Sequence, residues 1–414
     1  MSDNMSKFDK ACEQSPFLSL HHKTREFIEQ KSSLYSFSFS QIRELITAGV
    51  DLQMWGFDIK DLWQDEGRES FKKFFEKYER LKNSEKEYMH AKEQKQNQKI
   101  EFLDIDKNII GFGRCPVASP KTRCCNLLTL DAVEGCAYGC SYCSIQTFYG
   151  SKISLNRDFA RKLSQIKLDK NEIYHIGTGQ SSDSLMLGNK NDILEALIEF
   201  ARQNPNVILE FKSKSDNIDY LLKVKLPPNI ICTFSLNPQI VIDSEEHFTS
   251  SLKRRIKAAL KLSQKGILVG FHFHPMIWFK GWQEEYKYTA NELVQKFDPK
   301  TLALISMGTL TFIKPVLRQI RFNADKTKIL QMPLTGAHGK FSYPLSIKEQ
   351  MFGTLYKAFE AWHDEVFFYL CMEDESLWKS VFGFRYESNE IFEKAMKKAY
   401  MRKIKAAKNY KISP

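Results

Sequence analysis

Short apolar runs alternate with amphipathic stretches over the middle of the chain, from about residue 127 to residue 306. The apolar runs are rich in β-branched residues, as buried strands are, whereas the stretches between them carry apolar residues at helical spacing. The predicted strands are 127–131, 172–177, 207–212, 230–236, 267–273 and 301–306, and the predicted helices include 192–202, 216–224, 251–265 and 283–297. Repeated strand–helix units indicate parallel strands joined by right-handed crossovers. The sequence therefore predicts an α/β fold with a partial (β/α)6 TIM-like barrel, whose chemistry gathers at the carboxyl ends of the strands.

The two flanking regions have different patterns. Residues up to about 99 indicate helices separated by short breaks, and the charge-rich segment 71–98 is expected to be an exposed helix that leads into a linker. The C-terminal part is expected to hold a helix at 345–362, a strand at 365–371 and a basic tail. We predict three regions, which are an N-terminal mainly helical region (1–104), the barrel (105–320) and a C-terminal α+β extension (321–414).

Composition favours a folded chain outside membranes. A hydrophobic content of 43% is enough for one large core or two smaller ones. No run of about 18 apolar residues occurs, and the first residues lack the apolar segment of an export signal. We therefore expect a cytoplasmic protein with no membrane partner. A reducing cytosol would keep the nine cysteines available for metal binding or catalysis.

Three cysteines lie close together directly after the first predicted strand, in the segment GCAYGCSYCSIQ. Cys136, Cys140 and Cys143 have the spacing C-x3-C-x2-C. Three thiolates can ligate three irons of a 4Fe-4S cluster and leave the fourth iron open to a ligand with amino and carboxylate groups. Structural zinc is the alternative, but it needs four ligands, and no C-x2-C partner or H-x3-H follows within range. Gly135 and Gly139 would let the backbone fold tightly around a cluster.

This spacing, with an aromatic residue (Tyr142) before the third cysteine, resembles that of radical S-adenosylmethionine enzymes. Several blocks in the same order resemble the spore photoproduct lyase-like family over roughly residues 127–315. The resemblance implies a 4Fe-4S cluster, reductive cleavage of S-adenosylmethionine to a 5′-deoxyadenosyl radical, and hydrogen abstraction from a substrate, which for the family's namesake is a thymine dimer lesion in DNA. The blocks are GCAYGCSYCSIQTFYGSK, QSSDSLMLGN, LEFKSKSDNIDYLL, CTFSLNPQIVI and SSLKRRIKAALKLSQKGILVGFHFHPMIWFKGW.

Four polar residues and two glycines are candidates for binding the cofactor. The polar residues are implied by the resemblance, and each follows or ends a predicted strand, at the face where barrel ligands bind. The glycines would let the backbone approach the methionine end of the cofactor. Without the family match, each residue would equally fit an ordinary turn or a hydroxyl cap. The polar candidates are Ser182, Lys214, Ser235 and Asn237, and the glycines are Gly177 and Gly179.

Three departures from the family bear on the reaction. The family's hydrogen-donating cysteine lies in a C-T-S-D block after the second strand, where this chain has Gln180. Of a tyrosine pair around the last cluster cysteine, Tyr142 remains as the catalytic candidate and Ser144 replaces the other. The segment 335–343 corresponds to a lesion-probing hairpin but lacks its Arg-Tyr pair. A product radical would need another hydrogen source, either a different residue or 5′-deoxyadenosine.

Positive charge favours a polyanionic partner. The formal net charge is +11, and the segment 394–411 contains lysines and arginines but no acidic residue. This tail could follow phosphates, with Tyr400 and Tyr410 stacking on bases, or it could be a solvated basic helix. His272 and His274 are secondary acid–base candidates, and core histidines are the alternative.

The sequence thus predicts a radical S-adenosylmethionine enzyme that acts on a nucleic acid, with DNA favoured over RNA and lesion repair as one form. Its reductant would be an external flavodoxin or ferredoxin, because no second cluster motif is visible. One alternative is a radical enzyme that modifies RNA, a peptide or a small molecule. A second alternative is a metal-containing nucleic-acid-binding protein without turnover.

Overall fold

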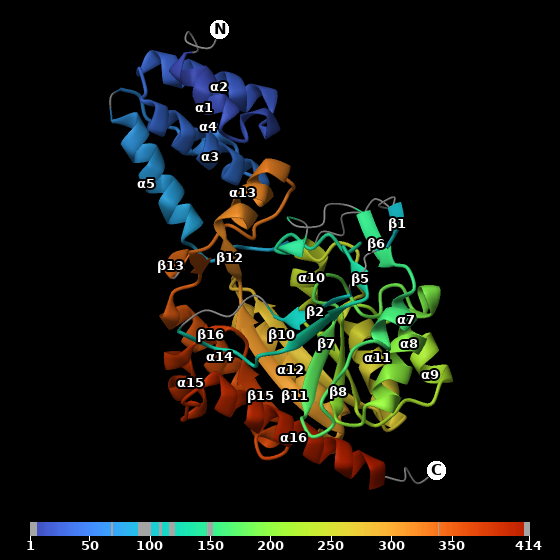
Figure 1. Ribbon diagram of the computed structural model, residues 1–414. Helices are drawn as coiled ribbons and strands as arrows, with labels where there is room; N and C mark the ends of the chain where they lie inside the picture. The colour runs from blue at the N-terminus through green and yellow to red at the C-terminus, as the bar shows by residue number, and fades with distance from the viewer. Residues whose placement is uncertain are drawn as a thin grey trace. The chain divides into compact units, whose positions relative to one another are not determined.

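The computed structural model describes residues 6–67, 69–89, 101–106, 110–115, 121–145, 147, 152–337 and 339–409 (Figure 1). The chain forms two compact units. The first comprises the N-terminal residues to Tyr88 together with 278–280 and 311–344, and the second comprises the rest of the chain. None of the helices in the described ranges is long and apolar enough to span a membrane.

The first unit is mainly helical and includes one small antiparallel sheet. Helix α3 begins with a capping box, in which Ser38 and Gln41 exchange hydrogen bonds, and ends at Gly56, whose φ of +86° suits a residue without a side chain. The sheet has the order β12-β14-β13, so the segment 335–343 forms a hairpin. The elements are α1 (Lys7–Glu13), α2 (His22–Leu34), α3 (Phe39–Trp55), α4 (Ile59–Leu62), α5 (Ser70–Lys82), β12 (Thr311–Ile313), α13 (Lys314–Asn323), β13 (Thr335–Ala337) and β14 (Lys340–Ser342).

A buried carboxylate joins three helices of this unit. Asp51 on α3 is fully buried and accepts hydrogen bonds at 2.7 and 2.9 Å from the guanidinium of Arg321 on α13. The hydroxyl of Tyr78 on α5 donates a third bond of 2.7 Å to Asp51. The Trp55 ring stacks on Tyr78, with centroids 5.7 Å apart and planes 6° from parallel. Asp51 therefore attaches α13 to α3 and α5, although almost three hundred residues separate the partners in sequence.

The second unit is built on an eight-stranded mixed sheet with the order β15-β11-β10-β9-β8-β7-β4-β2. All neighbours from β4 to β15 pair in parallel, and β2 adds an antiparallel edge. The strands are β2 (Gly111–Arg114), β4 (Leu128–Asp131), β7 (Tyr174–Thr178), β8 (Val207–Ser213), β9 (Ile230–Ser235), β10 (Leu268–Met276), β11 (Leu302–Thr309) and β15 (Phe367–Leu370). The six predicted parallel strands are confirmed, in the predicted order, and the predicted strand at 365–371 extends the sheet.

Helices connect the parallel strands, and small sheets lie beside the main one. The short sheets have the orders β1-β6-β5 and β16-β3. Their strands are β1 (Glu101–Ile105), β3 (Thr122–Arg123), β5 (Val133–Glu134), β6 (Lys152–Asn156) and β16 (Glu373–Asp374). The helices are α7 (Phe159–Leu163), α8 (Ile193–Gln203), α9 (Asp219–Lys223), α10 (Gln239–Glu245), α11 (Leu252–Gln264), α12 (Trp282–Lys296), α14 (Leu345–Ala358), α15 (Glu375–Phe382) and α16 (Asn389–Asn409).

Two helices differ from the sequence prediction. The exposed helix predicted at 71–98 is α5, which ends at Lys82 and buries Phe74 and Tyr78, so it is neither that long nor fully exposed. The basic tail is largely α16, and its Tyr400 is completely buried, with its ring edge-on to His175 and Phe367. The prediction that Tyr400 stacks on bases is wrong, because the apolar side of α16 packs against the sheet. Tyr410 lies outside the described residues.

Replacing Asp51 with alanine should destabilise the first unit by about 3 kcal/mol, because it leaves the largely buried Arg321 guanidinium without its counter-charge. Urea unfolding followed by tryptophan fluorescence would measure this loss, since Trp55 stacks on the Tyr78 partner of Asp51. Glu26→Ala on α2 is the matched control, because Glu26 forms an exposed pair with His22 and its loss should cost less than about 0.5 kcal/mol. Equal unfolding midpoints for the two variants would contradict the assigned role of Asp51.

Candidate functional site

Four loops that carry predicted site residues meet at one edge of the main sheet. The first loop comes after β4 and the short strand β5, and the other three follow β7, β8 and β9. In the main sheet, β4, β7, β8 and β9 are consecutive neighbours. Because these strands are parallel, their carboxyl ends lie at the same edge, where α/β folds bind ligands. The topology therefore brings residues 135–143, 179–183, 214 and 237 into one region of the molecule.

The cysteine loop begins with a tight turn that only glycine can occupy. Gly135 has a φ of +88°, and a Cβ there would lie 2.3 Å from the backbone oxygen of Lys152. Its N–H donates a 3.0 Å hydrogen bond to the backbone oxygen of Ser181 in the loop after β7. A second backbone bond of 3.0 Å runs from Cys143 to Cys140. The strand β6 and the loop after β7 thus fix where the cysteine loop starts.

The three predicted ligand thiols lie within electrostatic reach of one another. Burial raises the pKa of Cys136 to about 12 and the pKa of Cys140 well above its usual value, and neighbouring Cys143 raises both further. The Lys214 ammonium opposes these shifts. In the part of the chain that the structure describes, no three His, Cys, Asp or Glu side chains are arranged as a ready-made metal site. Metal binding by this loop would therefore require the thiols to turn toward one another and release their protons.

Asp183 clamps the loop after β7 to the end of β8. Its buried carboxylate accepts hydrogen bonds from the backbone N–H of Leu185 (3.0 Å) and Met186 (2.9 Å). It accepts two more from the Ser213 hydroxyl (2.7 Å) and the Lys214 backbone N–H (2.6 Å). Burial nevertheless raises the pKa of Asp183. The carboxylate holds the segment 183–186 in one position relative to the end of β8.

Beside this clamp, one buried polar atom has no partner. The Ser182 hydroxyl oxygen is buried and forms no hydrogen bond with any described residue. An unpaired buried hydroxyl costs about 1–3 kcal/mol, so such a group is normally satisfied by water or by a ligand. Gly179 shapes the same loop with a φ of +77°, and a Cβ there would lie 2.7 Å from the Ser184 hydroxyl. This loop therefore offers a free polar group where the sequence predicted cofactor binding.

The central polar interaction of the site is one that the sequence analysis missed. Glu246, which directly follows α10, is fully buried and forms an ion pair of 2.5 Å with Arg255 on α11. The hydroxyl of Tyr142 donates to Glu246 at 2.5 Å, and the Asn237 side-chain amide donates at 2.9 Å. The Lys214 ammonium lies 3.8 Å from the same carboxylate. Glu246 thus links the cysteine loop to the ends of β8 and β9.

The electrostatics of this network keep Glu246 ionised. Burial alone would raise its pKa, but the charges of Arg255 and Lys214 and the hydrogen bonds from Tyr142 and Asn237 together lower it to about 2. Burial and the adjacent Glu246 carboxylate raise the pKa of Tyr142 well above its usual value. The Tyr142 phenol therefore stays protonated and donates to the carboxylate, while the Lys214 ammonium lies 5.8 Å from its ring centre.

The remaining predicted residues occupy defined structural positions. Ser235 is buried at the end of β9, and its backbone oxygen accepts a 2.7 Å bond from Arg255. The side-chain nitrogen of Asn237 donates a hydrogen bond to Glu246, and its side-chain oxygen accepts a 2.8 Å bond from the Tyr286 hydroxyl. Gly177 lies within β7, where a Cβ would approach Leu127 to 3.0 Å. These contacts are structural, and whether the residues also contact a cofactor stays a prediction.

A second group of thiols lies near the loop after β7. The amide nitrogen of Gln180 lies 3.8 Å from the sulfur of Cys115, which follows β2. Cys371, directly after β15, has its pKa raised to about 12, mainly by burial and also by nearby Cys115 and Cys124. Cys115 and Cys371 are far apart in sequence and have no motif spacing, so only the order of the strands brings them together.

Both histidine candidates lie on β10, where His272 is buried and His274 is half-buried. His272 contacts Glu210 at 2.7 Å and also contacts Ser306, and burial lowers its pKa to about 4. Burial likewise lowers the pKa of His274 well below its usual value. Glu210 also contacts His175 at 2.8 Å. His272 is therefore a hydrogen-bonded core histidine, which is the alternative that the sequence analysis left open.

Replacing Glu246 with glutamine should destabilise the second unit by about 3 kcal/mol at pH 7, since it leaves Arg255 without its counter-charge. The folded pKa of about 2 lies below the ordinary value of 4.5, so ionised Glu246 contributes stability above pH 4.5 that is lost as the pH falls toward 2. The gap between wild type and Glu246→Gln should therefore close over this range in denaturant titrations. An exposed control, Glu199→Gln, should follow the wild-type profile. A constant gap from pH 7 to pH 2 would refute the role of Glu246.

Two curated relatives match part of the chain. Spore photoproduct lyase from a Geobacillus species is 30% identical over 208 residues, which are 48% of this chain and 61% of the relative. Spore photoproduct lyase from Bacillus subtilis is 29% identical over 203 residues, which are 47% of this chain and 59% of the relative. The chain thus spans about three-fifths of the length of these relatives.

Solved structures agree with this match at the level of the fold. A cysteine variant of spore photoproduct lyase is 23% identical, with a TM-score of 0.56 over 65% of this chain and 82% of that chain. Another variant, solved with bound AdoMet and dinucleoside spore photoproduct, is 22% identical with the same TM-score and covers 66% of this chain. The family model "Spore photoproduct lyase" matches residues 122–343, which is more than half of the chain. The matched range contains the cysteine loop, the Asp183 clamp and Glu246, and the chain belongs to the spore photoproduct lyase family.

Proposed function

We propose that this chain is a radical S-adenosylmethionine enzyme that acts on a nucleic acid, as a lyase or a related activity in lesion repair. The observation that carries the proposal is the convergence of three loops at the carboxyl edge of the sheet. One loop holds three thiols, the second offers the unpaired Ser182 hydroxyl, and the third ends in Lys214 beside Glu246. Soft sulfur donors next to an unsatisfied polar group suit a metal cluster with a polar organic ligand.

The donor chemistry of the loop fits a 4Fe-4S cluster. Cys136, Cys140 and Cys143 would provide three sulfur ligands on one short segment, and the Lys214 charge favours the thiolate forms of Cys136 and Cys140. When bound, the cluster and S-adenosylmethionine would supply a 5′-deoxyadenosyl radical. The protein's own part is to hold the three sulfurs, to orient the cofactor and to exclude water from the reaction.

The predicted cofactor-binding residues receive distinct roles in this proposal. Ser182 would donate its free hydroxyl, and the turn at Gly179 would let the backbone approach the cofactor. Lys214 would interact with the carboxylate of the cofactor. Its side chain is one-sixth exposed, and its ammonium already lies 3.8 Å from the carboxylate of Glu246. Tyr142 is proposed as the catalytic tyrosine, held in place by Glu246. Gly177, Ser235 and Asn237 complete the proposed set.

The substrate and partners follow from the family and from charge. A relative has been solved with a dinucleoside spore photoproduct, which favours a DNA lesion over RNA as the substrate of this chain. The net charge of +11 supports a polyanionic partner. We further propose an external flavodoxin or ferredoxin as the reductant, a cytoplasmic location, and a partial (β/α)6 barrel as the closure of the main sheet. The sequence regions 1–104, 105–320 and 321–414 also remain a proposal.

Cys115 is the thiol that we propose as the hydrogen donor. By resemblance, Gln180 stands where the family has its donating cysteine, and the Cys115 sulfur lies 3.8 Å from the Gln180 amide nitrogen. In the proposed step, the S–H bond of Cys115 breaks, its hydrogen atom forms a C–H bond at the substrate radical, and a sulfur-centred radical remains on Cys115. The thiol thereby supplies the hydrogen source for which the sequence provides no motif.

Simultaneous replacement of Cys136, Cys140 and Cys143 by alanine should abolish iron and sulfide binding in the anaerobically reconstituted protein. It should also abolish formation of 5′-deoxyadenosine from S-adenosylmethionine under reduction, because no sulfur ligands remain. Cys12→Ala, which removes one thiol from α1 in the other unit, is the control and should keep both properties. A wild-type protein that binds zinc without sulfide would overturn the proposal in favour of a binding protein without turnover.

Replacing Cys115 with serine should change where the product hydrogen comes from. With dinucleoside spore photoproduct as the probe in D2O, the wild-type thiol carries deuterium and should place one deuterium in the repaired product, as mass spectrometry would detect. Cys115→Ser should lose this label and accumulate by-products. Cys12→Ser should behave like wild type. An unchanged label in the Cys115 variant would exclude Cys115 as the donor.

A further inference from the structure

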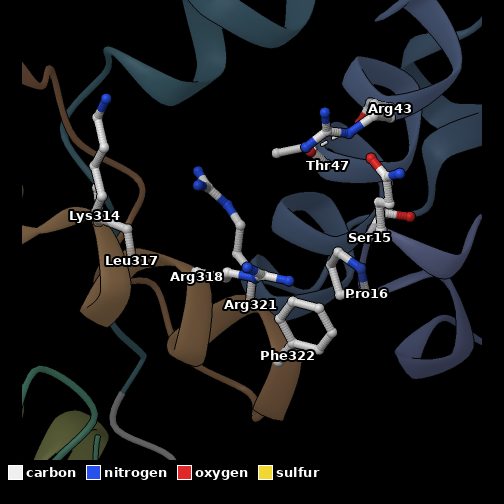
Figure 2. Close-up of a pocket in the computed structure, with 10 residues that line it drawn as sticks. Ser15, Pro16, Arg43, Thr47, Lys314, Leu317, Arg318, Arg321 and Phe322 are labelled. Atoms are coloured by element: carbon white, nitrogen blue, oxygen red, sulfur yellow. Dashed lines mark hydrogen bonds between the residues drawn. The ribbon is translucent and has the colours of Figure 1, made fainter. Parts of the chain in front are cut away.

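A cavity of about 590 Å³ lies within the first unit, outside the thiol loops (Figure 2). Its walls come from the segment after α1, from α3 and from α13. A volume in this range is typical of sites that bind a small molecule or a nucleotide-sized group. Neither the cysteine motif nor the family match requires a cavity at this position.

The described residues that line the cavity include four cations and no acidic side chain. Lys314, Arg318 and Arg321 lie along one side of α13 at spacings of four and three residues, which places them on a single helix face. Arg43 enters from α3. Figure 2 shows the α13 residues Lys314, Arg318, Arg321 and Phe322 on one side of the cavity and the α3 residues Arg43 and Thr47 on the other.

One of the four cations is already neutralised. Arg321 forms two hydrogen bonds with buried Asp51 and therefore supports the wall. In contrast, Arg43, Lys314 and Arg318 are exposed, and none of the three forms an ion pair with a described residue. The cavity therefore presents three positive charges without an ion-pair partner, and Asp51 links the two helices that carry them.

Aromatic rings orient both free guanidinium groups. Arg318 lies over the Phe322 ring at 5.1 Å from its centre, and Arg43 lies over Phe39 at 5.5 Å. A guanidinium stacked on a ring keeps its N–H edge available for paired hydrogen bonds, which is the geometry that phosphate oxygens accept. The chemistry of the cavity is thus that of an oxyanion site with two arginine forks and one ammonium.

We propose that this cavity binds a phosphodiester of the nucleic-acid backbone. The inference rests on the proposed function, because a nucleic-acid substrate is what supplies the phosphates. Helix α13 begins directly after β12, and β12 pairs with β14 of the hairpin at 335–342. Lys314 and Arg318 therefore lie on a helix that is joined, through β12, to this hairpin. By sequence, the hairpin corresponds to the family's lesion-probing element. The cavity would hold one backbone segment while the hairpin contacts a neighbouring one.

The test is fluorescence anisotropy of a labelled 20-nucleotide single-stranded DNA with the full-length reconstituted protein, repeated over a range of salt concentrations. Arg43→Ala combined with Arg318→Ala should weaken binding at least tenfold. It should also reduce the slope of log K against log salt by about 0.7, because the cavity would neutralise one phosphate of the single strand. The Arg43→Lys and Arg318→Lys pair should keep the slope, which shows that the loss in the alanine variant does not come from misfolding.

The matched control is Lys72→Ala with Arg80→Ala, which removes the same charge from exposed positions of α5. Equal weakening by both double variants would overturn the proposal, since net charge alone would then explain binding. Binding of phosphatidylglycerol vesicles that depends on Arg43 and Arg318, with unchanged DNA binding, would also overturn it. A wild-type protein that binds DNA through the cavity but forms no 5′-deoxyadenosine would instead refute the proposed function and leave the cavity assignment intact.

Discussion

The buried ion pair between Glu246 and Arg255 is the interaction on which the site depends. A carboxylate without a counter-charge is unstable in the protein interior, so Glu246 needs its ion-pair and hydrogen-bond partners. Those partners come from separate strands and loops. Tyr142 comes from the cysteine loop, and Asn237 follows β9. One charge thereby fixes the distances between segments that the chain does not connect directly, and it stays ionised throughout the neutral range.

The sequence predicted the sheet well because parallel strands buried on both faces are continuous apolar runs. The run at 230–236 became β9, which is buried throughout, and the run at 207–212 became β8, in which Lys212 alone is half-buried. It predicted the cysteine loop because the motif is local. It did not predict Glu246, since a glutamate in the polar segment DSEEHFTS has the pattern of a solvent-exposed turn. Arg255 similarly has the pattern of the charged face of α11, although it is completely buried.

Long-range contacts explain the other differences. The basic composition of α16 indicates a solvated helix, but Tyr400 and Ile404 are buried on its other side. The segment 311–344 belongs to the unit of the N-terminal helices, and a pairing such as Asp51 with Arg321 has no signal in the hydrophobic pattern. Periodicity reports which face of an element is buried, but it does not report which distant element covers that face.

The Asp183 clamp also has a consequence for the order of maturation. Its carboxylate accepts hydrogen bonds from Ser213 and Lys214, some thirty residues later in the chain, and the same loop accepts the N–H of Gly135 just before the first thiol. The segment that presents the sulfurs is therefore incomplete until β8 has been synthesised and has joined the sheet. Iron delivered to the emerging polypeptide would meet unordered thiols, so insertion of the proposed cluster would follow folding, at the end of biogenesis.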